Sequence, residues 1–144
     1  MTDLEKARAL LADGSFGNCI LYRNGTIHAS HGKGIAPMLE FLEAGIDMTD
    51  FSAADTVVGK ALAFLFVHAG VKEVYADVMS ESAVKILSLY RVRHVHGELV
   101  EQIKNRAGNG ICPMESAVEN IEGHDEAYEI LKAKYTALTR NTRR

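Results

Sequence analysis

The spacing of apolar residues in the first third of the chain predicts a helix, a β-hairpin and a second helix. Apolar residues recur every three or four positions from Leu4 to Leu11, the period of a helix with one buried face. Two apolar runs follow, and Asn24-Gly25 between them is typical of a tight hairpin turn. Pro37 suits the first turn of the next helix. The predicted elements are a helix over 4–13, strands over 19–23 and 26–30, and a helix over 36–45.

The rest of the chain alternates helices with strands. The segment VVGKALAFLFV is apolar on nearly every side, as in a helix buried at the centre of a domain, so we predict a helix from about Ala53 to His68. KEVYADVM contains several residues that favour strands and indicates an interior strand. The other predicted elements are strands over 72–79 and 92–96 and helices over 80–90, 97–106, 111–121 and 124–138.

This order of elements predicts an α/β fold. A hairpin followed by strand–helix–strand units predicts a mixed sheet with helices on both faces, which is a three-layer α/β/α sandwich. A chain of 144 residues is long enough to bury a sizeable core and fits a single domain over 1–144.

The composition, 47% apolar and 24% charged, is that of an ordinary soluble globular protein. A net charge of −3 does not indicate a nucleic-acid partner. No apolar run reaches the roughly 18 residues that cross a bilayer, and the acidic, amphipathic N-terminus is unlike a signal peptide. Cys19 and Cys112, the only cysteines, imply no disulfide framework. We therefore expect a cytoplasmic protein with no membrane or nucleic-acid partner and, as for many small domains, a homodimer.

Ligands of α/β sheets bind in the crevice beyond the carboxyl ends of the parallel strands, where helix N-termini also gather. If the predicted elements are right, several polar segments of this chain meet at that edge. A small-molecule ligand is therefore the expected partner. The candidate segments are HGKG (31–34), Ser52–Asp55, Asp77–Glu81 and Gly108–Glu115.

Cys112 is the main candidate for chemistry. In CPME it takes the N-cap position of a predicted helix, with Pro113 at N1 and Glu115 at N3. The helix dipole and free backbone N–H groups there favour a thiolate, so Cys112 is a candidate nucleophile or metal ligand. The alternative is a small residue that fills space while Glu115 serves a capping box. Gly110, in the preceding GNG, allows either a turn or the close approach of a ligand.

Asp55 and Lys60 are the candidate proton carriers. Ser52-x-x-Asp55 before an apolar run also fits a capping box, which is a purely structural role. Lys60 is the only charge in its apolar run, so it needs an acid such as Asp77 as a partner or extends its amine to the surface. Gly59 would cost a helix about 1 kcal/mol relative to Ala, which indicates a close packing contact.

Four further residues are candidate ligand contacts. Asp77 stands near the carboxyl end of an interior strand, where its carboxylate either contacts a ligand or faces solvent. Ser80 and Glu81 open the next predicted helix, and Ser80 is first of all a good N-cap. Lys33, in HGKG, either binds a phosphate together with backbone N–H groups or belongs to a plain connector.

No metal site is expected from the spacing of histidines and cysteines. His94 and His96 share one face of a predicted strand, but the chain has no CxxC pair. Two cysteines cannot build the usual cysteine-rich zinc centres. Histidines that face solvent are the better account, so we expect no metal and no other cofactor.

Three stretches of the chain resemble the DUF1893 family, a microbial domain of unknown function. The resemblance implies a cytidine-deaminase-like fold with a core over about 15–121, and the helix over about 124–138 follows this core. It implies no particular activity. The stretches are GKGIAPMLEFL (32–42), ADTVVGKALAFLFV (54–67) with GVKEVYADVMSESA (70–83), and NRAGNGICPMES (105–116).

The sequence departs from zinc-dependent deaminases at the residues that hold the metal. Those enzymes carry an H-x-E signature at one helix start and P-C-x-x-C at the next. The corresponding positions here read SAAD (52–55) and MSES (79–82), with no histidine and no cysteine pair. Zinc-dependent deamination is therefore not expected.

The leading functional interpretation is a protein that binds a small anionic or nucleotide-like ligand in a cleft at the carboxyl edge of the sheet. In its enzymatic form, Cys112 is the nucleophile of a cysteine-dependent reaction. One alternative is a ligand-binding or redox-sensing module without turnover, in which the ancestral zinc site has been lost. Another is a role in assembly.

Overall fold

The computed structural model describes residues 1–105, 107–108 and 110–142. Arg106 and Asn109, which belong to the predicted helix over 97–106 and to the GNG segment, lie outside the described residues. The elements, in chain order, are α1 (Asp3–Asp13), β1 (Cys19–Arg23), β2 (Thr26–Ser30), α2 (Ala36–Glu43), β3 (Ser52–Val58), α3 (Lys60–Ala69), β4 (Glu73–Ser80), α4 (Glu81–Leu89), β5 (Arg93–Val100), α5 (Pro113–Ala117) and α6 (His124–Thr142).

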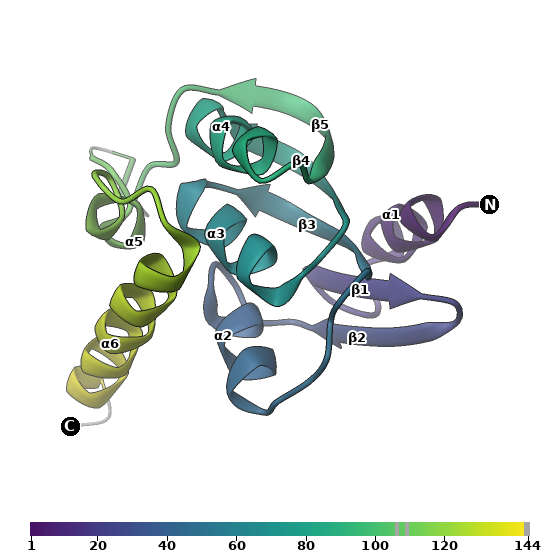
Figure 1. Ribbon diagram of the computed structural model, residues 1–144, viewed down its shortest axis with the longest axis horizontal. Coiled ribbons are helices and arrows are strands. Elements are labelled where there is room, and N and C mark those ends of the chain that lie inside the picture. Colours follow the sequence, from purple (N-terminus) through teal and green to yellow (C-terminus); the bar gives the residue numbers. More distant parts are fainter. Residues whose placement is uncertain (106, 109, 143–144) are drawn as a thin grey trace.

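The strands form one five-stranded sheet in the order β2-β1-β3-β4-β5 (Figure 1). β1 is antiparallel to both of its neighbours, whereas β3, β4 and β5 are parallel to one another. Helices α2, α3 and α4 cover one face of this sheet and α1 lies on the other. The predicted α/β class with a mixed sheet between helices is therefore confirmed.

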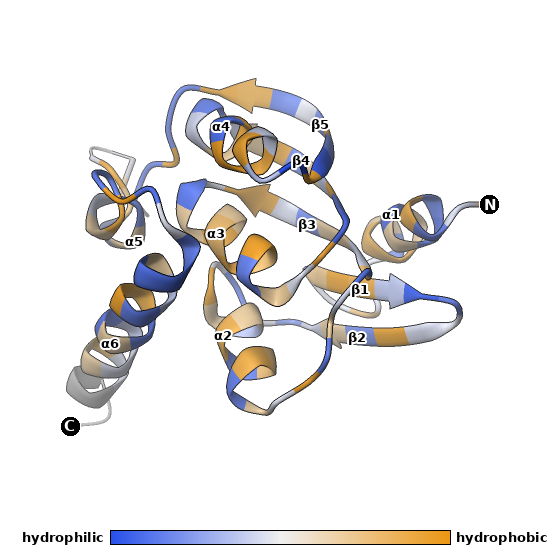
Figure 2. Cartoon of the chain, in the orientation of Figure 1, coloured by the Kyte–Doolittle hydropathy of each residue, from blue (hydrophilic) through white to orange (hydrophobic). Residues whose placement is uncertain are grey.

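The core lies mainly between the sheet and α3 (Figure 2). Phe64, Leu65 and Phe66 in the middle of α3 are fully buried, although consecutive helical residues point in different directions. Such all-round burial is possible because α3 packs against the sheet on one side and against α4 and α6 on others. No helix among the described residues is both long and apolar enough to span a bilayer.

The predicted hairpin is confirmed residue by residue. β1 and β2 pair from Cys19 with Ser30 to Arg23 with Thr26. The turn between them is Asn24-Gly25, both with positive φ (46° and 88°). Two successive positive φ values are what a type I′ turn requires, and its twist matches that of the flanking strands.

The prediction of one helix over 53–68 is wrong in its first half. Ser52–Val58 form β3, and the helix begins only at Lys60. β3 is the middle strand of the sheet, and Ala53 and Ala54, which point to opposite faces, are both fully buried. A strand covered on both faces shows no alternation of apolar and polar residues, so its pattern is that of a buried helix.

The capping box predicted from Ser52 to Asp55 is also wrong, because both residues are inside this strand. Instead, the Ser52 hydroxyl donates a hydrogen bond to the Glu73 carboxylate on β4. Gly59 occupies the N-cap position of α3, between strand and helix. The close contact expected there is real: a Cβ on Gly59 would lie 2.7 Å from Cδ of Glu115 and 2.8 Å from Cγ1 of Ile103.

The predicted helices over 97–106 and 111–121 are also wrong in part. Residues 97–100 of the predicted helix over 97–106 belong to β5, because residues 98–100 pair with residues 78–80 of β4 and this pairing outweighs local propensity. The predicted helix over 111–121 is reduced to the five residues of α5. Lys104 and Ile111 form an isolated antiparallel bridge.

Candidate functional site

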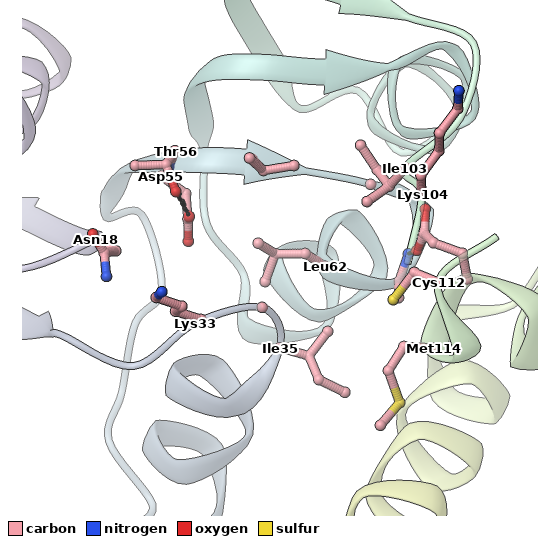
Figure 3. A pocket seen from close by; sticks show the side chains of 15 residues that line it. Asn18, Lys33, Ile35, Asp55, Thr56, Leu62, Ile103, Lys104, Cys112 and Met114 are labelled. Carbon is pink, nitrogen blue, oxygen red and sulfur yellow. Dashed lines mark hydrogen bonds between the residues drawn. The ribbon is translucent and has the colours of Figure 1, made fainter. Parts of the chain in front are cut away.

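A cleft of about 400 Å³ opens at the carboxyl edge of the parallel strands. Its floor is the end of β3 and the first turn of α3, and Leu62 lies at its centre (Figure 3). Asn18 and Lys33 lie on one side, and Ile103, Cys112 and Met114 lie on the other. Segments that are far apart in the sequence therefore meet where a sheet of this kind is expected to bind ligands.

Asp55 is the most perturbed acid of the cleft. It is 5% exposed, and burial raises the pKa of its carboxyl to about 7, against the lowering effect of hydrogen bonds. Those bonds come from the N–H of Thr56, at 2.7 Å, from the N–H of Val57 and from the Cys19 thiol. A carboxyl that titrates near neutral pH can both release and accept a proton, which is the property of a general acid or base.

Cys19 is the neighbour of Asp55 across the β1–β3 ladder. Burial, reinforced by the Asp55 carboxylate, raises the pKa of the Cys19 thiol well above its usual value. Cys19 therefore stays a neutral thiol at physiological pH and donates to Asp55. From the sequence, Cys19 is recognisable only as the first residue of a predicted strand, since pairing across strands cannot be seen in the order of residues.

Glu115 closes the floor of the cleft by capping α3. Its Oε1 accepts from the N–H of Lys60 at 2.8 Å and its Oε2 from the N–H of Ala61 at 2.7 Å. The capping-box role predicted for Glu115 within its own helix is therefore wrong: the residue caps a helix that begins 55 positions earlier. Burial raises the pKa of Glu115, and the two N–H groups and the Lys60 charge oppose that shift.

Cys112 lies on the wall of the cleft opposite Asp55 (Figure 3). It is the N-cap residue and Pro113 follows in the first turn, as predicted, but its side chain makes no cap hydrogen bond. The helix behind it has only five residues, so its dipole is weaker than the predicted helix of 111–121 would supply. What remains of the hypothesis is a half-buried free thiol that faces a ligand-sized space.

Lys60 is at the start of α3, yet its side chain leaves the cleft. Its amine donates to the carbonyl of Glu119 at 2.9 Å and lies 5.8 Å from the centre of the Phe64 ring. The partner is therefore not Asp77, and the alternative of an amine that extends toward the surface describes the geometry better. Of the two predicted proton carriers, Asp55 is the one that lines the cleft.

The structure places four of the predicted ligand contacts outside the cleft. Asp77 is exposed and accepts a hydrogen bond from the Tyr75 hydroxyl at 2.8 Å. Ser80 is the N-cap of α4 and accepts from the N–H of Ala83 at 3.1 Å, while Glu81 is exposed on the same helix. The carbonyl of Gly110 accepts a hydrogen bond from the N–H of Asn105 at 2.8 Å.

Asn18 and Lys104 are polar residues of the cleft that the sequence did not indicate. Asn18 donates from its side-chain amide to the His31 carbonyl at 3.0 Å, which holds the HGKG loop and Lys33 beside β1. Lys104 lies on the opposite wall, in the loop that follows β5. The one signal in the sequence for Asn18 is its position directly before β1, which is antiparallel to β3 and therefore starts at the carboxyl edge of the parallel strands. Lys104 fell within a segment predicted to be helical.

The helix starts at the carboxyl edge of the sheet differ from the expectation drawn from the sequence. The segment SAAD (52–55), which was expected to open a helix, lies inside β3, and the helix start that follows it is Gly59–Leu62. Neither this start nor Ser80–Ala83 at the start of α4 contains a histidine or cysteine. The free N–H groups at the first start are taken by the Glu115 carboxylate.

These features define an α/β protein with a ligand-sized cleft at the carboxyl edge of a mixed sheet. The chain belongs to the family described as a domain of unknown function, DUF1893, whose family model matches residues 6–135. No curated protein matches it.

Two solved structures from Thermotoga maritima are similar to this chain. The DUF1893 family protein TM1506 matches with a TM-score of 0.83 and 22% identity, over 93% of this chain and 91% of that protein. A diaminohydroxyphosphoribosylaminopyrimidine deaminase/5-amino-6-(5-phosphoribosylamino)uracil reductase matches with a TM-score of 0.44 and 14% identity, over 66% of this chain and 36% of that one. The first likeness shows the fold that the two DUF1893 proteins share.

Proposed function

We propose that this protein binds a small anionic, nucleotide-like ligand in the cleft between Asp55 and Cys112. The observation that carries the proposal is the cleft itself, with a volume of about 400 Å³, mostly apolar walls and a few converging polar groups. Small-molecule sites have volumes of roughly 300–1,000 Å³ and the same division between apolar walls and sparse polar groups.

The polar and apolar parts of the cleft suit different parts of such a ligand. Lys33 and Lys104 supply positive charge for an anionic group. Asp55, which is partly protonated near pH 7, can donate to or accept from the polar edge of a heterocycle. Leu62 and Met114 supply apolar surface for a flat ring.

The first test compares cytidine 5′-monophosphate with cytidine as probes in titration calorimetry. We expect the monophosphate to bind more tightly, because only it meets the lysines with a charge. Lys33→Ala should weaken monophosphate binding by about tenfold, equivalent to about 1.4 kcal/mol, and leave cytidine binding unchanged. Lys85→Ala, on the exposed face of α4, is the matched control. If neither probe nor inorganic phosphate binds, the ligand proposal fails and the assembly role gains support.

Cys112 decides whether binding leads to chemistry. In the enzymatic form of the proposal, its thiolate adds to an unsaturated electrophilic carbon of the ligand. The C–S bond forms as a π bond of that carbon opens, and the atom at the other end of the π bond takes the proton of the Asp55 carboxyl. In the other form, the cleft holds its ligand without turnover and the thiol is a contact or a redox sensor. The described residues that line the cleft include no histidine to act as a base, which favours the second form.

Alkylation of Cys112 separates these two forms. Iodoacetamide should modify Cys112 and spare the buried Cys19, and mass spectrometry of peptides assigns the label. An activated nucleophile should react at least about tenfold faster at pH 7 than the same cysteine in an unfolded peptide, since its thiolate fraction is higher. A rate equal to or below that of the peptide would remove the nucleophile from the proposal and leave the binding module.

A further inference from the structure

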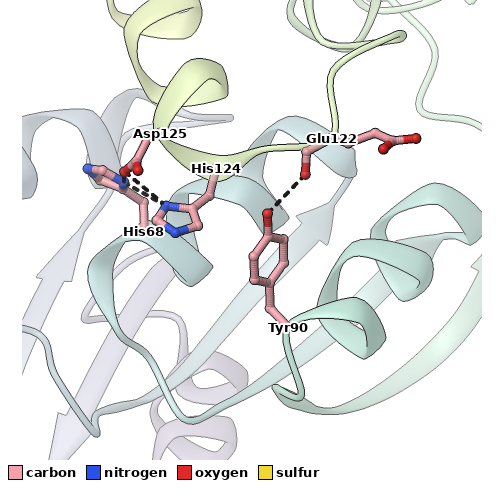
Figure 4. Close-up of polar contacts among 5 residues, drawn as sticks. All are labelled: His68, Tyr90, Glu122, His124 and Asp125. Atoms are coloured by element: carbon pink, nitrogen blue, oxygen red, sulfur yellow. Dashed lines mark hydrogen bonds and ion pairs between the residues drawn. The ribbon is translucent and has the colours of Figure 1, made fainter.

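Two histidines and an aspartate meet away from the cleft, where the end of α3 contacts the start of α6 (Figure 4). His68 is in the last turn of α3, and His124 and Asp125 are the first two residues of α6. The Nδ1 atoms of the two rings are 3.0 Å apart. Oδ1 of Asp125 lies 3.3 Å from each of them.

The three atoms form a triangle with nearly the dimensions of one face of a zinc tetrahedron. Zinc bonds nitrogen and carboxylate oxygen at about 2.0–2.2 Å, and tetrahedral angles then separate neighbouring ligand atoms by about 3.3–3.5 Å. Hydrogen bonds explain the triangle less well. Each ring nitrogen carries at most one hydrogen, so if one neutral ring donates its Nδ1–H to the Nδ1 of the other, no further Nδ1 hydrogen is left for Asp125.

Both rings are held in this orientation by neighbouring aromatic residues. The Tyr128 ring stacks on His68 with centroids 4.4 Å apart and an interplanar angle of 22°. The Tyr90 ring meets His124 at 5.3 Å and 76°, and the Tyr90 hydroxyl donates to the Glu122 carbonyl at 3.0 Å. Groups that fix ligand orientation in advance lower the cost of binding a metal.

The local charge also suits a cation. Asp125 and Glu129 both place negative charge beside His68. The carbonyl end of the α3 dipole adds to this field, because His68 is in the last turn of that helix. The side chain of Asp125 is 85% exposed, so an ion can reach the triangle from solvent.

We propose that His68, His124 and Asp125 bind a divalent transition-metal ion, zinc above others, with three protein ligands and water at the fourth position. Imidazole and carboxylate ligands in tetrahedral geometry suit zinc among the common biological metals. The ion joins two helices whose ligands are 56 residues apart in the sequence. Its effect is to fasten α6 to α3, and it is independent of any ligand in the cleft.

The test is the binding of zinc alone to the full chain, by equilibrium dialysis and by calorimetry. We expect one zinc ion per chain. Both His68→Ala and Asp125→Asn should weaken binding at least about tenfold, equivalent to about 1.4 kcal/mol. Cobalt in place of zinc should give the visible absorption of a tetrahedral centre, and each variant should lose it. Asp125→Asn alters an exposed side chain, so it keeps the test valid if His68→Ala does not fold.

Two control variants identify the site. His94→Ala removes a histidine on β5 whose Nδ1 lies 3.0 Å from the Val92 carbonyl, and it should bind zinc as the natural chain does. Cys112→Ser removes the thiol of the cleft and should also leave zinc binding intact. A natural chain that binds no zinc overturns the proposal. So does zinc binding that survives His68→Ala and Asp125→Asn or disappears with Cys112→Ser.

Discussion

Replacing Glu115 with Ala should destabilise the protein by about 2–3 kcal/mol, because the two N–H groups at the start of α3 then lose charged acceptors. The cost is larger than that of a surface cap, since α3 is the central helix of the core and Glu115 is the side chain that closes its first turn. Urea denaturation measures the change. Glu119→Ala, an exposed acid four residues later, should change stability by less than about 0.5 kcal/mol.

A substitution at Gly59 tests the same contact between Glu115 and the start of α3. Gly59→Ala should also destabilise the protein, because the added Cβ meets Cδ of Glu115 at 2.7 Å and pushes the cap away. The φ angle of −102° is acceptable for alanine, so backbone strain plays no part. In a chain that already carries Glu115→Ala, the same glycine substitution should cost about 1–2 kcal/mol less. If the effects of the two substitutions on the free energy of unfolding were strictly additive, the claim that Glu115 caps α3 would be contradicted. Gly123→Ala, in open space, is the glycine control.

Asp55 should make the protein less stable as the pH rises from about 4 to about 7. Its pKa is raised to about 7 in the folded chain, from 3.8 for a free carboxyl, so over this range the folded state retains a proton that the unfolded state has released. The free energy of unfolding therefore falls by up to about 1.4 kcal/mol per pH unit, on the order of 3–4 kcal/mol in total. The full contribution is present below the unfolded pKa and is lost above the folded one.

The Asp55→Asn variant isolates this effect from all other titrating groups. An amide resembles the protonated carboxyl in shape and does not ionise, so the variant should lack this part of the pH dependence. The difference in unfolding free energy between variant and natural chain should thus shift in favour of the variant between about pH 4 and pH 8. Denaturation at several pH values measures it. A difference that stays constant with pH would show that Asp55 does not carry the raised pKa.

The elements that were predicted correctly are those whose signal is local. Asn24-Gly25 specifies its turn through the backbone conformations that these residues accept. Ser80 caps α4 because its hydroxyl reaches an N–H three residues ahead. The same is true of Pro37 in the first turn of α2. In each case the interacting groups are within four residues, so the pattern alone contains the physical cause.

The errors arise where a distant segment decides the local structure. Ala53–Val58 is a strand because it pairs with β1 on one side and with β4 on the other. As the middle strand it is covered on both faces, so its apolar and polar residues do not alternate. The candidate site shows the same division. The sequence indicated Asp55, Cys112, Glu115 and Lys33 by residue type and placed them at one edge of a sheet. It could not separate them from Asp77, Ser80, Glu81 and Gly110, because that choice depends on which side chains face the cleft.

The sequence by itself determined the α/β class, the hairpin, most helix positions and the family. It also supplied the residue types for a cleft without the deaminase zinc ligands. Only the tertiary structure decided that Glu115 caps a helix 55 positions away and that His68 meets His124. The physical reason is that hydrogen-bond and metal-ligand geometry operates over about 2–3 Å. Distances of that size between remote residues are set by packing of the whole chain and leave no periodic trace in the order of its residues.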